Sequence, residues 1–160
     1  MKEFEQVYQQ YFTKVYRFLL GITGNEHLAD ELTQETFLRA LLNKATYREQ
    51  GHMLTWLCTI AKNLWLKECR RHRFDAIPEV ELPDPSPTPE QQILQREQNF
   101  ALQQALLQLP EEYRDVVLLH IYAQLPLKEI AAMKGKSESW GKVTFYRAKQ
   151  QLRRRMEENE

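Results

Sequence analysis

One expected helix carries, on one of its faces, side chains that suit nucleic-acid binding. Residues at helical spacing run from about Met53 to Arg73. Beside an apolar stripe, this segment has a second stripe with Trp56, Asn63, Lys67, Arg70 and Arg71. An indole stacks on an unpaired base, an amide hydrogen-bonds to a base edge, and cations neutralise phosphates. The same stripe also fits a solvated face whose basic last turn complements the helix dipole.

A helix-turn-helix pattern is expected near the C-terminus. A short helix from Leu127 to Met133 and a turn at Gly135 precede a long basic helix from about Ser137 to Met156. In this motif the second helix enters the major groove, where its side chains contact phosphates and base edges. Its polar side chains include Lys142, Thr144, Tyr146, Arg147 and Lys149. The alternative is a charged amphipathic helix that packs through Val143, Phe145 and Leu152.

Acidic residues gather on another expected helix, from about His27 to Leu42. Its polar positions include Asp30, Glu31, Gln34, Glu35 and Arg39. Paired carboxylates serve acid-base catalysis, but no nucleophilic serine or glycine-rich loop accompanies these in the sequence. A face that meets solvent or a protein partner is therefore favoured over an active site.

The cysteines and histidines do not indicate a metal or redox centre. Cys58 and Cys69 fall on one expected helix, about 16 Å apart at 1.5 Å rise per residue, too far for a disulfide. The chain has neither a CxxC nor an HExxH motif, and its four histidines are scattered. We therefore expect no metal, no cofactor and no enzymatic activity.

The elements that must position these side chains are all expected to be helices. Apolar residues recur at three- and four-residue spacing from Phe4 to Ile22, and again after Gln91. Between Ile77 and Pro89 lie five of the seven prolines, with three acids, and such a segment excludes a helix or sheet interior. The fold class is therefore all-α, with two small helical domains, 1–75 and 93–160, joined by an acidic proline-rich linker, 76–92.

The charges balance overall but are unevenly distributed. The 160 residues carry 22 Lys and Arg against 22 Asp and Glu. Residues 1–75 hold 11 basic and 9 acidic side chains, residues 76–100 hold 1 and 5, and residues 101–160 hold 10 and 8. The net charge of zero therefore includes two basic segments, Lys62–Arg73 and Lys134–Arg155. A net charge of zero does not exclude a nucleic-acid partner.

The hydropathy of the chain indicates a protein of the cytoplasm. No apolar run approaches the roughly 18 residues that a membrane-spanning helix needs. The first residues, Met1 to Glu5, lack a signal-peptide pattern.

The order of the motifs resembles that of a known family. The segments 30–40 and 55–64 resemble the sigma-two domain of extracytoplasmic-function (ECF) sigma factors of the sigma-seventy family. The segments 109–117, 127–131 and 144–149 resemble their sigma-four domain, and the two blocks come in the family's order. The resemblance implies an alternative sigma factor that binds core RNA polymerase and directs promoter-specific transcription initiation. The alternative function is a helical adaptor or sigma-like regulator that binds a protein partner without reading promoters.

The resemblance also implies partners and roles for individual residues. The polymerase partners are the clamp of the largest subunit and the flap of the second-largest, and an anti-sigma factor, often membrane-anchored in relatives, is a further candidate. The residues implied to contact the clamp are Asp30, Gln34, Glu35 and Arg39. Those implied to contact the minus-ten promoter element are Trp56, Asn63, Lys67, Arg70 and Arg71, with a base-capturing pocket around 43–53. Those implied to contact the minus-thirty-five element are Ser139, Lys142, Val143, Thr144, Tyr146 and Arg147.

Gly141 departs from the family pattern, because a valine is common at its place. A glycine inside a helix costs about 1 kcal/mol relative to alanine. We expect the neighbouring Trp140 to fill the space that Gly141 leaves.

Overall fold

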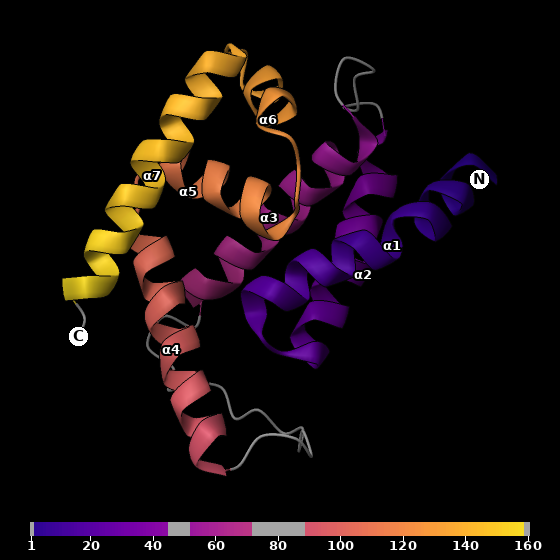
Figure 1. Ribbon diagram of the computed structural model, residues 1–160. Coiled ribbons are helices and arrows are strands. Elements are labelled where there is room, and N and C mark those ends of the chain that lie inside the picture. Colours follow the sequence, from indigo (N-terminus) through magenta and orange to yellow (C-terminus); the bar gives the residue numbers. More distant parts are fainter. Residues whose placement is uncertain (1, 45–51, 72–88, 159–160) are drawn as a thin grey trace.

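Every regular element in the described part of the chain is a helix. The computed structural model describes residues 2–44, 52–71 and 89–158 (Figure 1). In chain order the elements are α1 (Lys2–Thr23), α2 (Glu26–Leu42), α3 (Met53–Arg71), α4 (Pro89–Gln108), α5 (Glu111–Val117), the π-helical turn η2 (Leu118–Tyr122), α6 (Leu127–Met133) and α7 (Glu138–Glu158). The predicted all-α class is confirmed. Most of the expected linker and of the base-capturing loop lies outside the described residues.

The first three helices pack on one another around an apolar core. The core-facing residues of α1, among them Val15, Phe18 and Leu19, are buried, as the helical spacing predicts. On α2 the ring of Phe37 receives the ring of Tyr8 edge-on, with 5.0 Å between centroids. Asn25 caps the start of α2, because its Oδ1 accepts a hydrogen bond from the Leu28 amide at 3.0 Å.

The helix α4 begins earlier than expected. Its first residue is Pro89, so the last four residues of the expected 76–92 linker are helical. Proline is favoured at the first helical position because an N–H at that position has no acceptor within the helix, so proline loses no hydrogen bond by lacking one.

Helices α6 and α7 form the predicted helix-turn-helix. Two backbone hydrogen bonds close the turn. Gly135 N donates to the Ala132 carbonyl at 3.0 Å, and Lys136 N donates to the Ala131 carbonyl at 2.8 Å. This pair is a Schellman motif, which needs a left-handed residue, and Gly135 has φ +69°. Ser137 begins α7 by accepting a hydrogen bond from Trp140 N at 3.2 Å on its Oγ.

Gly141 lets α6 and α7 approach closely, so the expectation that Trp140 fills a space beside it is wrong. A Cβ at position 141 would lie 3.1 Å from the Leu127 carbonyl oxygen and 3.5 Å from the Ala131 Cβ. The glycine is buried, and the backbone of α6 already occupies the place of a side chain. A periodic pattern along one helix does not show how near its neighbour comes.

Enlarging Gly141 is expected to loosen the helix-turn-helix. For Gly141→Val we expect a loss of about 1–3 kcal/mol in unfolding free energy, as for other overpacked sites. For Gly141→Ala the gain of about 1 kcal/mol in helix propensity offsets a smaller strain. Chemical denaturation of the two variants checks the ranking, and equal stability of both variants would contradict it.

The two halves of the chain share one continuous core. Buried residues of α1 to α3 and of α5 to α7 belong to a single apolar cluster. Helix α3 contacts η2 and α6, and α1 contacts η2 (Figure 1). The two regions expected as separate domains therefore pack against each other in this structure.

Candidate polymerase and promoter interface

Helices α2 and α3 form an open hollow that contains most of the predicted minus-ten residues. The hollow measures about 310 Å³ and is lined by Arg39, Asn43, Trp56, Ile60, Asn63, Leu64 and Lys67. Trp56 is half-buried, whereas Asn63 and Lys67 are exposed. An aromatic ring, two amides and two cations around a hollow of this size can hold a flat ring and its phosphate.

The remaining predicted minus-ten residues lie beyond the hollow on the last turn of α3. Arg70 and Arg71 are both exposed there, and Arg71 Nη1 lies 3.8 Å from Glu68 Oε2. Exposed ion pairs of this kind contribute little to stability, so the arginine remains available to a phosphate.

Helix α3 has a third face that sequence reasoning missed. Thr55, Lys62 and Leu66 are buried on it, although Lys62 was counted in a basic segment. Lys62 Nζ lies 2.9 Å from Asp115 Oδ1 on α5. Its charge is therefore neutralised within the protein and does not add to the basic surface of α3. No signal in the sequence links Lys62 to a residue that lies so far along the chain.

The four residues predicted to contact polymerase lie along α2. Asp30, Gln34 and Arg39 are exposed and Glu35 is half-buried. Arg39 Nε donates to Glu35 Oε1 at 3.1 Å. Arg39 also lines the hollow of α3, so it joins the two predicted surfaces.

Two exposed leucines on α2 were missed by the sequence analysis. Leu38 is 51% exposed and Leu42 is 73% exposed. With about 3.6 residues per turn, both fall between Gln34 and Glu35 in the middle of the exposed face. Exposed apolar residues flanked by polar ones are typical of a protein-binding surface. The i, i+4 spacing of two leucines outside the core stripe is the signal that could have identified them.

The exposed face of α7 carries five of the six predicted minus-thirty-five residues. Ser139, Lys142, Val143, Tyr146 and Arg147 are exposed, with Tyr146 at 59%. Gln150, which was missed, extends this face, and its Nε2 donates to the Tyr146 hydroxyl at 3.0 Å.

Thr144 lies on the opposite side of α7 from these residues. It is 5% exposed, and it shares its face with the buried Gly141 and Ala148. Its spacing of three residues from Gly141 and four from Ala148 directs it into the core. We therefore leave Thr144 out of the surface that meets DNA.

The described residues do not provide a metal centre or a reactive thiol. Within 2–44, 52–71 and 89–158, no three His, Cys, Asp or Glu side chains come together as metal ligands. Burial raises the pKa of the Cys58 thiol to about 12, and burial with the nearby Glu68 does the same for Cys69. Both thiols are therefore protonated near neutral pH, and thiolate chemistry is not supported.

The architecture defines an all-helical protein in which a three-helix unit, α1 to α3, is followed along the chain by a helix-turn-helix, α6 and α7. Among the helices described, none has the length and apolar character needed to cross a bilayer. Residues 7–74 match sigma-70 region 2, and residues 99–152 match sigma-70 region 4.

Relatives of known family share these regions. The ECF RNA polymerase sigma factor SigM of Bacillus subtilis is 30% identical over 93% of this chain and 92% of its own length. The RNA polymerase sigma factor YlaC of the same organism is 31% identical over 95% of this chain and 91% of its own. The chain belongs to the ECF sigma factors of the sigma-70 family. It is an alternative sigma factor that directs transcription initiation.

Solved structures show the same fold. The sigma factor RpoE in complex with the anti-sigma factor NepR from Bartonella quintana has a TM-score of 0.60 at 18% identity, covering 98% of each chain. CnrH in complex with the cytosolic domain of CnrY has a TM-score of 0.62 at 18% identity, covering 99% of this chain and 90% of that one.

Proposed function

We propose that the chain brings core RNA polymerase to promoters through three surfaces, of which the first two share Arg39. The exposed face of α2 contacts the polymerase clamp, the α2–α3 hollow takes the minus-ten element, and the outer face of α7 takes the minus-thirty-five element. The observation that carries this proposal is the exposure of both DNA-facing stripes, while the other faces of α3 and α7 are buried. The sigma-four half then contacts the flap of the second-largest polymerase subunit.

The proposed mechanism uses binding energy alone, without covalent chemistry. Basic residues of α3 and α7 neutralise phosphates, and Trp56 stacks on a base that leaves the duplex. Asn63, about two helical turns along the same face, hydrogen-bonds to a base edge. No catalytic group or cofactor is required.

The proposed setting is the cytoplasm, where polymerase and chromosome meet. An anti-sigma factor is a proposed further partner, supported by the complexes in which the RpoE and CnrH structures were solved. In vitro transcription of a genomic library with core polymerase tests the function itself. The absence of any transcript that depends on the chain would contradict it.

Arg147→Ala is expected to weaken recognition of the minus-thirty-five element. A guanidinium that contacts a base edge discriminates by about 1–3 kcal/mol, so we expect roughly 5- to 150-fold weaker occupancy there. Footprinting of the holoenzyme measures the occupancy of the minus-thirty-five element.

Lys149→Ala is the matched control for Arg147→Ala. It also removes one cation from α7, but its Nζ lies over the Phe145 ring, 4.9 Å from the centroid. Equal footprints for both variants would contradict a specific role for Arg147.

A further inference from the structure

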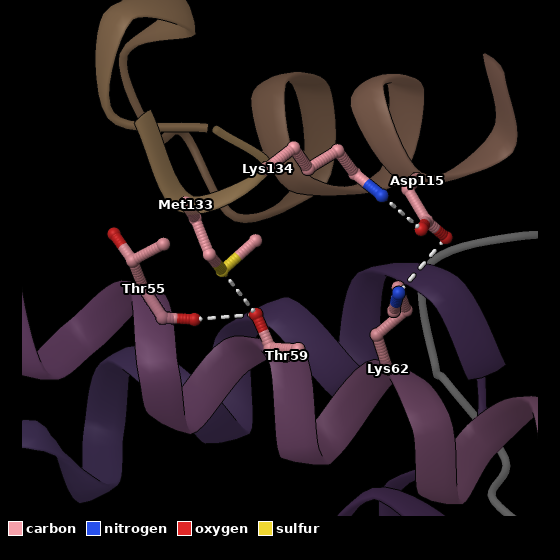
Figure 2. A network of polar contacts seen from close by, with 6 residues as sticks. All are labelled: Thr55, Thr59, Lys62, Asp115, Met133 and Lys134. Atoms are coloured by element: carbon pink, nitrogen blue, oxygen red, sulfur yellow. Dashed lines mark hydrogen bonds and ion pairs between the residues drawn. The ribbon is translucent and has the colours of Figure 1, made fainter. Parts of the chain in front are cut away.

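A buried group of charges joins the two halves of the chain. Asp115 of α5 is held between Lys62 of α3 and Lys134, the residue that follows α6 (Figure 2). Lys62 Nζ lies 2.9 Å from Oδ1, and Lys134 Nζ donates to Oδ2 at 2.8 Å. The side chains of Asp115 and Lys62 are only 2% and 6% exposed.

These charges depend on one another because they are removed from water. Burial lowers the pKa of Lys62, and the Asp115 carboxylate opposes that effect. Removing one partner of such a buried group leaves an uncompensated charge, which is far costlier than losing an exposed ion pair. The group therefore favours packing of the two halves only while all three members are present.

Other polar contacts surround this group at the same junction. Thr59 Oγ1 lies 3.1 Å from Met133 Sδ (Figure 2). Thr55 Oγ1 donates to Glu129 Oε2 at 3.2 Å. At the far edge Gln103 Nε2 donates to the Ile22 carbonyl at 2.9 Å. A Cβ placed on Gly21 would lie 3.3 Å from the Tyr122 ring, so α1 and η2 approach closely there.

The closed arrangement does not fit a chain bound to both promoter elements. The two elements are separated by about 25 base pairs, or about 85 Å at 3.4 Å per pair. A compact chain of this length has a radius of gyration of about 15 Å and is roughly 40 Å across. The segment from Arg71 to Pro89 can extend to at most about 60 Å, so the halves could reach both elements if they separated.

We propose that Asp115, Lys62 and Lys134 form a latch that holds the free chain closed and must open before the chain engages both promoter elements. This inference rests on the proposed function, since it requires one DNA surface on each half. Both surfaces stay exposed in the closed form. The latch acts by fixing the distance between them and not by covering either one.

Breaking the latch is expected to expand the free chain. For Asp115→Asn we expect the open population to rise at least tenfold, with a radius of gyration by small-angle scattering clearly above about 15 Å. The far-UV circular dichroism should keep its helical signal. An unchanged radius of gyration with intact helices would overturn the proposal.

Two further variants separate opening from unfolding. The double variant Lys62→Met/Asp115→Leu replaces the two most buried charges by apolar groups of similar size and leaves only the more exposed Lys134, so it is expected to stay closed. Lys134→Gln removes the most exposed member of the latch and is expected to open the chain. If Asp115→Asn loses its helical signal, Lys134→Gln decides: a radius that stays near the wild-type value overturns the proposal.

Locking the junction tests its effect on transcription. In a Cys58→Ala/Cys69→Ala background, Thr59→Cys and Met133→Cys are joined by a disulfide or, failing that, by a short bis-maleimide, and the joined chain is added to core polymerase. On a promoter selected from a genomic library, we expect at least tenfold less transcript from the joined chain than from the same chain unjoined. Equal transcript from the joined and unjoined chains would overturn the latch.

Scattering and footprinting test the latch and the proposed promoter surfaces independently. Scattering of the free chain reports the latch without DNA or polymerase. Footprinting with the unjoined chain reports the promoter surfaces. A compact wild-type chain that opens on latch substitution, but gives no footprint, would refute the proposed surfaces while leaving the closed conformation supported.

Discussion

Replacing Trp56 and Asn63 together by alanine is expected to reduce transcription about 100-fold or more, without weakening assembly with core polymerase. Stacking of one base on an aromatic ring contributes about 1–3 kcal/mol, and a good amide contact to a base edge contributes a similar amount. Both side chains line the α2–α3 hollow, and neither belongs to the exposed stripe of α2. Single-round transcription and a core-polymerase pull-down measure the two quantities.

Conservative substitutions provide the control for this result. Trp56→Phe keeps an aromatic face and should restore much of the activity, whereas Asn63→Asp keeps the size but removes the donor and should not. Loss of the double variant from the polymerase pull-down would show that these residues serve assembly and not promoter opening.

The double substitution Leu38→Asp/Leu42→Asp is expected to weaken binding to core polymerase by about 100-fold. Burying a leucine contributes about 1.5–3 kcal/mol, and both leucines are mostly exposed in the free protein. Because neither belongs to the core cluster, the variant should fold normally. A titration of labelled protein with core polymerase gives the affinity.

A charge control belongs with this measurement. His27→Asp also adds an acid to α2, at an exposed position near its N-terminus, where acids suit the helix dipole. We expect it to bind polymerase normally. If it weakened binding as much as the leucine substitutions, net charge and not apolar contact would be the cause.

Local patterns were sufficient to predict the helices and the turn. The three- and four-residue periodicity of α1, the Gly135 turn and the Ser137 cap each depend on near neighbours in the sequence, and all are present. The buried side of α7 was also accessible to the same reasoning. Thr144 lies three residues after Gly141 and four before Ala148, which places all three on one face.

Contacts between distant segments could not be predicted in this way. Lys62 resembles the other cations of α3, and only the position of Asp115 in space shows that it is buried and paired. Gly141 appeared as a helix defect until the carbonyl of Leu127 was found beside it. Each of these features depends on which helix packs against which, and single-sequence periodicity does not contain that information.

If the proposed latch opens, the burial of Lys62 links DNA binding to that opening. In the closed form Asp115 neutralises this cation, whereas separation of the halves would return it to solvent on the same helix as Asn63 and Lys67. A cation gained only on opening releases one more counterion when α3 meets DNA, which steepens the salt dependence of binding. By linkage, the free energy by which opening strengthens DNA binding equals the free energy by which bound DNA favours the open chain.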